Sequence, residues 1–93
     1  MNRPKYILDS YALLAYFQAE PAGAKVRNIL KEAAAGAAKA FLSVINLGEI
    51  YYIVARKRGE EKAGAITEDI SRLPVGLVDA TKERVLAAAR VKA

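Results

Sequence analysis

Short apolar runs alternate along the chain with longer segments in which apolar residues recur at helical spacing. The short runs predict three strands, at Tyr6–Leu8, Ala40–Leu42 and Val75–Val78. The periodic segments predict helices from Tyr11 past Phe17, over Ala24–Ala35, Val44–Arg58 and Glu60–Ser71, and a last one with Val85, Leu86 and Ala89 on one face. Strands that alternate with helices predict an α/β fold with a mostly parallel sheet covered by helices on both faces.

The ends of these segments carry residue types that commonly begin and end helices. Ser10, Ser43 and Asp79 stand where N-caps are expected, because their side chains can accept hydrogen bonds from the first backbone N–H groups. Gly36 and Gly59 mark the ends of the second and third helices. We therefore expect residues 1–93 to form a single domain with a modest core.

The amino-acid composition excludes several kinds of catalytic and metal-binding site. The 93 residues include no cysteine and no histidine, which excludes disulfides, thiolate or imidazole zinc sites, and Ser-His or Cys-His catalysis. No apolar run approaches the roughly 18–20 residues that span a bilayer, and no signal peptide is apparent, so we predict a cytoplasmic protein without a membrane partner. The net charge of +5 favours anionic partners, with nucleic acid first among them.

One carboxylate stands among apolar residues at the predicted junction of the first strand and helix, in the stretch YILDSYALLAYF. An ionised Asp9 in such surroundings needs a compensating partner, which can be a backbone cap, a cation or a metal ion. An N-cap or turn role would make Asp9 purely structural, and taken alone this interpretation is favoured.

A second carboxylate, Glu49, lies in the apolar helix that follows Ser43, three residues after Asn46. Ile45 and Ile53 stand one turn before and one turn after it. A surface glutamate is more commonly surrounded by lysine, arginine or glutamine. The alternative is that the helix reaches the surface at Glu49, or that an arginine or lysine from elsewhere pairs with it.

Two isolated acids in the most apolar stretches of a basic protein suggest a shared site. Asp9 and Glu49 would repel each other at one edge of a parallel sheet unless they shared a proton or bound a cation. Oxygen ligands without histidine or cysteine favour Mg²⁺ or Mn²⁺ over zinc. The end of a strand is also where open α/β sheets bind ligands. We therefore predict that the two carboxylates face one cleft, about 4–8 Å apart.

Both motifs resemble those of PIN-domain ribonucleases. The run ILDSYALLAY, residues 7–16, resembles the opening strand and helix of that family, above all in the VapC-type toxins of toxin–antitoxin pairs. The segment SVINLGEIYY, residues 43–52, resembles the second motif, whose acid follows the first by about forty residues. Residues 73–93 match what comes next, so the resemblance covers essentially the whole chain.

The resemblance implies a three-layer α/β/α fold and a Mg²⁺-dependent endoribonuclease that cuts RNA and pairs with a cognate antitoxin. It implies that Asp9 and Glu49 are the catalytic and metal-binding acids, and we place Ser10 and Asn46 beside them as supporting residues. Asp79 is not catalytic in this resemblance and remains a predicted N-cap.

The chain departs from the family pattern at its far end, because the third and fourth acids and the last strands of the family lie downstream of residue 93. We therefore expect a partial PIN-like domain with little ribonuclease activity on its own. The alternatives are a non-catalytic module that binds an antitoxin or a partner toxin, and a fragment without a separate function. A receiver domain would need an acidic pair at Asp9, and a haloacid-dehalogenase-type phosphatase would need an Asp-x-Asp there, so both are disfavoured.

Two surfaces are expected to bind other molecules. The basic residues around the end of the third helix are predicted to contact RNA phosphates: Arg56, Lys57, Arg58 and Lys62. The alternative is that the first three merely complement the helix C-terminus. An edge strand at Tyr6–Leu8, together with the apolar faces of the first helix (Leu13, Leu14, Phe17) and the third, predicts a homo-oligomer.

Overall fold

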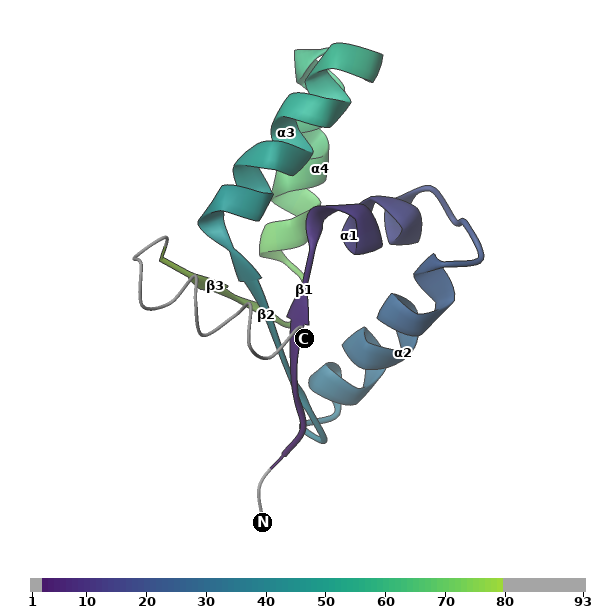
Figure 1. Cartoon of the computed structure of the whole chain (residues 1–93), viewed down its shortest axis with the longest axis vertical. Coiled ribbons are helices and arrows are strands. Elements are labelled where there is room, and N and C mark those ends of the chain that lie inside the picture. The colour runs from purple at the N-terminus through teal and green to yellow at the C-terminus, as the bar shows by residue number, and fades with distance from the viewer. Residues whose placement is uncertain (1–2, 80–93) are drawn as a thin grey trace.

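The computed structural model describes residues 3–79, which alternate strands and helices as predicted (Figure 1). The elements are β1 (Lys5–Leu8), α1 (Ser10–Phe17), α2 (Gly23–Ala34), β2 (Lys39–Ser43), α3 (Val44–Arg58), α4 (Glu60–Ser71) and β3 (Val75–Val78). Their bounds differ from the predicted ones by one or two residues at most. The last predicted helix falls on residues 80–93, outside the described part, so the role of Asp79 as its N-cap stays a prediction.

The three strands form a parallel sheet in the order β1-β2-β3. Leu42 of the central strand β2 is paired with Leu8 of β1 on one side and with Leu77 of β3 on the other. The predicted fold class, α/β with a parallel sheet, is therefore confirmed. The predicted edge position of the first strand is confirmed as well, because β1 has one neighbouring strand within residues 3–79.

One hydrophobic core joins the sheet to the helices. Side chains alternate between the two faces of a strand, so Leu8, Ala40 and Leu42 lie on the same face, and all three are buried. The core residues that pack with them come from every described helix: Leu13 and Leu14, Val26, Ile29 and Leu30, Ile50 and Val54, and Ala63 and Ile70. Phe41 points to the other face, is half-buried and does not belong to this core.

Two glycines set the turns that bring the helices together. A Cβ atom at Gly23 would lie 2.6 Å from Tyr16 Cα and 2.7 Å from the Ala15 carbonyl oxygen, so α2 can begin this close to α1 only with glycine. Gly59 has a φ of 92°, in the region that favours glycine, and separates α3 from α4. The two helices can therefore run back along each other (Figure 1).

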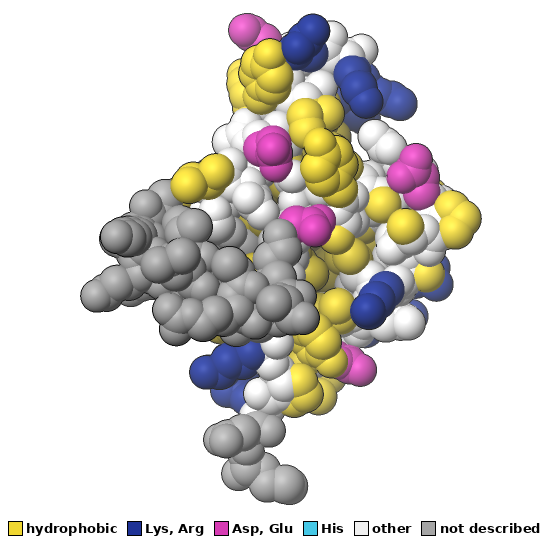
Figure 2. Space-filling view, viewed as in Figure 1, with side chains coloured by type: hydrophobic (Ala, Val, Ile, Leu, Met, Phe, Trp, Pro, Cys, Tyr) yellow, Lys and Arg dark blue, Asp and Glu magenta, His cyan; other side chains and the backbone are white. Residues whose placement is uncertain are grey.

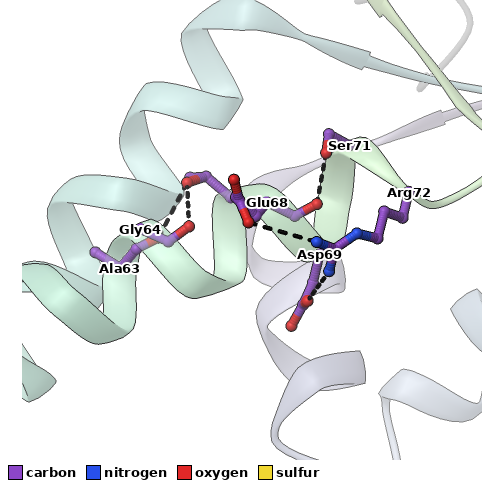
Figure 3. Close-up of polar contacts among 7 residues, drawn as sticks. Ala63, Gly64, Glu68, Asp69, Ser71 and Arg72 are labelled. Atoms are coloured by element: carbon purple, nitrogen blue, oxygen red, sulfur yellow. Dashed lines mark hydrogen bonds and ion pairs between the residues drawn. The ribbon is translucent and has the colours of Figure 1, made fainter.

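The C-terminal end of α4 carries a small group of surface contacts (Figure 3). Ser71 Oγ donates a hydrogen bond to the Glu68 carbonyl oxygen at 2.5 Å. The Arg72 guanidinium pairs with the carboxylates of Glu68 at 3.5 Å and Asp69 at 3.4 Å, and all three side chains are exposed. Such exposed pairs contribute about 0–1 kcal/mol, so they add little to the stability of the fold.

Large apolar side chains that remain exposed gather on α3, namely Val44, Ile45, Tyr51 and Tyr52. The expectation that α1 would also present an uncovered apolar face is wrong for Leu13 and Leu14, which are buried because they pack into the common core. In the part of the chain that the structure describes, no helix is both long and apolar enough to cross a bilayer.

Candidate active site

Asp9 lies directly after β1 and caps the first turn of α1. Its backbone is extended (φ −103°, ψ 172°), and its Oδ1 accepts a hydrogen bond from the Ala12 backbone N–H at 2.7 Å. The prediction that Ser10 is the N-cap is therefore wrong by one residue. A carboxylate has about four lone-pair sites, so capping through Oδ1 is compatible with a role for Asp9 in metal binding.

Ser10 connects the two predicted motifs. Its side chain is only 2% exposed, and its Oγ donates a hydrogen bond to Glu49 Oε1 across a separation of 39 positions in the sequence. Aspartate and serine are about equally good N-caps, so the hydrogen bond to Glu49 determines which of the two residues caps α1. Asp9 is the N-cap, and Ser10 is hydrogen-bonded to Glu49. The structure thus brings Glu49 beside the residue that follows Asp9.

Glu49 itself is exposed, and so is Ile45 one turn before it, at 55%. The structure therefore agrees with the alternative that α3 reaches the surface at Glu49. The other alternative, pairing with a cation, is not seen in the described part of the chain. Within residues 3–79, the ion pairs that form involve Arg72 and acids of α4, and none includes Glu49.

The start of α3 matches its prediction. Ser43 Oγ accepts hydrogen bonds from the backbone N–H groups of Ile45 at 3.0 Å and Asn46 at 3.3 Å. Asn46 is half-buried one turn before Glu49, on the same side of the helix. Both α1 and α3 therefore begin at the carboxyl edge of the parallel sheet, where the positive ends of their dipoles favour negative charge.

The side chains at this edge suit a hard divalent cation. Asp9 and Glu49 offer carboxylate oxygens, and Mg²⁺ in proteins is commonly bound through one or two carboxylates while water and substrate phosphate fill the remaining positions. Residues 3–79 contain no group of three or more His, Cys, Asp or Glu placed to hold a metal ion. The site as described therefore rests on two carboxylates, and the predicted 4–8 Å between them stays a prediction.

The predicted RNA-binding residues fall into two groups. Lys57, Arg58 and Lys62 line one hollow between α1, α3 and α4. Arg56 does not line it: its guanidinium donates a hydrogen bond to Tyr52 Oη at 3.1 Å and lies 5.5 Å from the centre of that ring. The four cations were predicted to form one patch, but in the structure Arg56 lies apart from the other three.

Two exposed tyrosines near the acids were not predicted as site residues. Tyr11 directly follows Ser10 and is 71% exposed, and Tyr52 lies one turn after Glu49 and is 58% exposed. Exposed aromatic rings can stack on nucleobases. The signal in the sequence that could have identified these tyrosines as site residues is their position next to the two acid motifs. Figure 2 shows acidic side chains toward the middle of the viewed face, among hydrophobic ones.

The chain is similar to one known protein family. The family model for the PIN domain matches residues 6–93, a range that includes both acid motifs. No curated protein and no solved structure gives a significant match to the chain.

Proposed function

The chain belongs to the PIN domain family, which is generally a nuclease fold, and from this premise we propose that it is a Mg²⁺-dependent endoribonuclease of the VapC type. In this proposal it is the toxin of a type II toxin–antitoxin pair, with RNA as substrate and a cognate antitoxin as partner. The observation that carries the proposal is the hydrogen bond from Ser10 to Glu49. It joins the two acid motifs at the carboxyl edge of the sheet.

Each residue of the site has a distinct part in the proposed reaction. Asp9 and Glu49 would hold Mg²⁺ or Mn²⁺, and such an ion acidifies water and offsets the negative charge that develops on the phosphate. Ser10 orients the Glu49 carboxylate through its hydroxyl, and the N-cap bond from Ala12 orients that of Asp9. Asn46 supports the site from the turn before Glu49.

Substrate binding is supported by charge and by aromatic groups. The net charge of +5 attracts a polyanion, and cations line a hollow beside the two helices that carry the acids. The exposed rings of Tyr11 and Tyr52 stand next to the two acid motifs, and exposed aromatic rings are groups on which unpaired bases stack. These features favour single-stranded RNA over a small anionic substrate.

The test measures metal binding and cleavage side by side. The full chain is titrated with Mn²⁺ while the spin resonance signal of the free ion is recorded, and it is incubated with single-stranded RNA and Mg²⁺ with or without EDTA. Because the described residues supply two carboxylates, we expect weak metal binding and slow cleavage. Asp9→Asn and Glu49→Gln should abolish both, whereas Glu32→Gln, an exposed acid on α2, should change neither. Mn²⁺ binding that survives in both site variants would refute the proposal.

A second candidate function is a non-catalytic module that binds a partner protein. The exposed apolar side chains Val44, Ile45 and Tyr51 on α3 favour it, because contiguous apolar surface usually marks an interaction site. An antitoxin or a second copy of the chain could occupy that surface, and a second copy could also pair with the edge strand β1. Light scattering of the purified chain, alone and with Ile45→Lys, would test self-association: we expect an assembly that the variant weakens.

A further inference from the structure

We propose that the hollow between α1, α3 and α4 binds one nucleotide of single-stranded RNA, a few positions away from the phosphate that is cut. We call it the basic hollow. This inference rests on the proposed ribonuclease function, which it deepens by assigning a binding subsite outside the acid pair.

The walls of the basic hollow combine an apolar floor with a cationic rim. Leu14, Ile53 and Ile66 contribute apolar surface from three different helices, and Lys57, Arg58 and Lys62 contribute the charges. The hollow has a volume of about 300 Å³. This lies at the lower end of the roughly 300–1,000 Å³ that small-ligand pockets occupy, so it suits a single nucleotide.

The three cations are not neutralised by the part of the protein that is described. Within residues 3–79, none of Lys57, Arg58 and Lys62 forms an ion pair or a side-chain hydrogen bond, while Arg72 pairs with two acids. Like charges around one hollow repel one another, and an anion bound between them relieves this repulsion. A phosphate group is therefore favoured at the rim.

The position of Lys62 shows that attraction to helix dipoles does not by itself explain the three cations of the basic hollow. Lys57 and Arg58 lie in the last turn of α3, where cations are favoured by the helix dipole. Lys62 is the third residue of α4, and the same dipole disfavours a cation in the first turn, where Glu60 and Glu61 are well placed. Its position is explained if the charge serves the hollow.

The basic hollow continues the contact that forms the candidate active site. Residues four apart share one side of a helix, so Ser10 and Leu14 of α1, followed by its C-cap Gln18, form one stripe, and Glu49, Ile53 and Lys57 of α3 form another. Ser10 and Glu49 are hydrogen-bonded, and the other four line the hollow. At 1.5 Å per residue, Ile53 and Lys57 lie about 6 and 12 Å beyond Glu49 along the helix. A strand whose phosphate meets the acids therefore reaches the hollow within a few nucleotides.

An acidic peptide with large apolar side chains would match the same charge and polarity. The observations favour RNA, because the hollow is nucleotide-sized and its lining begins one helical turn beyond the Ser10–Glu49 contact, whereas a peptide helix needs a groove several turns long. The peptide is therefore the competing outcome of the test.

The first measurement is fluorescence anisotropy of a labelled single-stranded RNA of about ten nucleotides, in EDTA so that no cleavage occurs. The double variant Lys57→Gln/Lys62→Gln should bind about tenfold more weakly, and its salt dependence should lose about 1.4 units of slope for two phosphate contacts. The matched control Arg27→Gln/Lys31→Gln removes the same charge from exposed positions on α2 and should change binding less than about twofold. Equal effects of the two double variants would overturn the proposal.

The second measurement asks whether the floor holds a base. The unaltered chain should bind the RNA about fivefold more tightly than a strand of equal length without bases, and Ile66→Ala should reduce that preference. An absent preference, or tighter binding of an acidic leucine-rich peptide at the hollow, would overturn the inference. If Asp9→Asn and Glu49→Gln retain Mn²⁺ binding while the hollow behaves as expected, the nuclease proposal fails and the RNA subsite stands.

Discussion

The contact between α1 and α3 has two ends that differ in kind. At one end Ser10 donates to Glu49 at the edge of the sheet, and no lysine or arginine within residues 3–79 pairs with that glutamate. At the other end the same helices open into a hollow rimmed by cations that form no ion pairs in the described part. Opposite charges are thus kept apart along one interface instead of neutralising each other. The difference suggests that one end performs chemistry on an anion that the other end binds.

The largest expected effect comes from changing the acid end alone. Glu49→Gln keeps the Ser10 contact sterically possible but removes the charge that would hold a divalent ion, so cleavage of RNA should fall about 100-fold or more. Binding of RNA in EDTA should stay the same, because the basic hollow is untouched. Gel-based cleavage rates and anisotropy on one protein preparation test both. A parallel fall in binding would show that the two ends are not separate.

A smaller effect is expected when the residue that positions Glu49 is changed. Ser10→Ala should slow cleavage about tenfold, as removal of groups that orient metal ligands commonly does. The loss of the hydrogen bond should also lower the free energy of unfolding by about 1 kcal/mol, because the exposed Glu49 can be hydrated instead. Cleavage rates and urea denaturation check this. Ser10→Thr, which retains a hydroxyl, should restore part of the rate; no restoration would argue against a positioning role.

A change to an exposed tyrosine tests whether RNA bases stack near the acid end of the interface. Tyr11→Leu should weaken RNA binding about fivefold, since stacking of one base on an aromatic ring contributes about 1–3 kcal/mol. The matched change Tyr51→Leu, on α3 but less exposed and two residues from Glu49, should have little effect. Anisotropy with a pyrimidine-rich single strand measures both. Equal losses of RNA affinity in the two variants would indicate that both tyrosines act through packing within the protein and not through stacking on a base.

The smallest effect should come from the ion pairs at the end of α4. Arg72→Ala removes contacts to two exposed carboxylates, and the free energy of unfolding should change by less than about 0.5 kcal/mol. Cleavage and RNA binding should be unaffected, because Arg72 lies outside both ends of the interface. Thermal denaturation is the measurement. A large destabilisation would mean that these surface pairs stabilise the fold that carries the site.

Much of the fold follows from local sequence signals. The three strands are short apolar runs, and Ser43 and Gly59 begin and end α3 as predicted, because capping depends on the side chain and backbone at the cap itself. The cap of α1 was assigned to the wrong residue for a physical reason. Asp9 and Ser10 are equivalent caps locally, and the choice between them depends on Glu49, which is 39 positions from Ser10.

The site was predicted in part. The pairing of the Asp9 and Glu49 motifs was expected, but the exposure of Glu49 was not, because apolar residues are distributed all around the first part of α3, Val44–Ala55, and the sequence pattern does not show which side faces the solvent. Arg56 and Lys57 are consecutive on α3 and therefore point about 100° apart around the helix, a separation that helical periodicity could have predicted. That Lys62 joins Lys57 at the hollow depends on the angle at which α4 returns beside α3, which the local sequence does not show.

The Ser10–Glu49 contact also determines when during synthesis the site can form. The two residues are 39 positions apart, and α2 and β2 lie between them. Contacts that close long loops are slow to form, because the entropy of the intervening chain must be lost first. The ribosome releases Ser10 well before Glu49, so a nascent chain holds one acid motif without the other. The topology thus delays the appearance of a complete acid pair until α3 has docked on α1, and local separation of these two helices would abolish the site while the sheet remained intact.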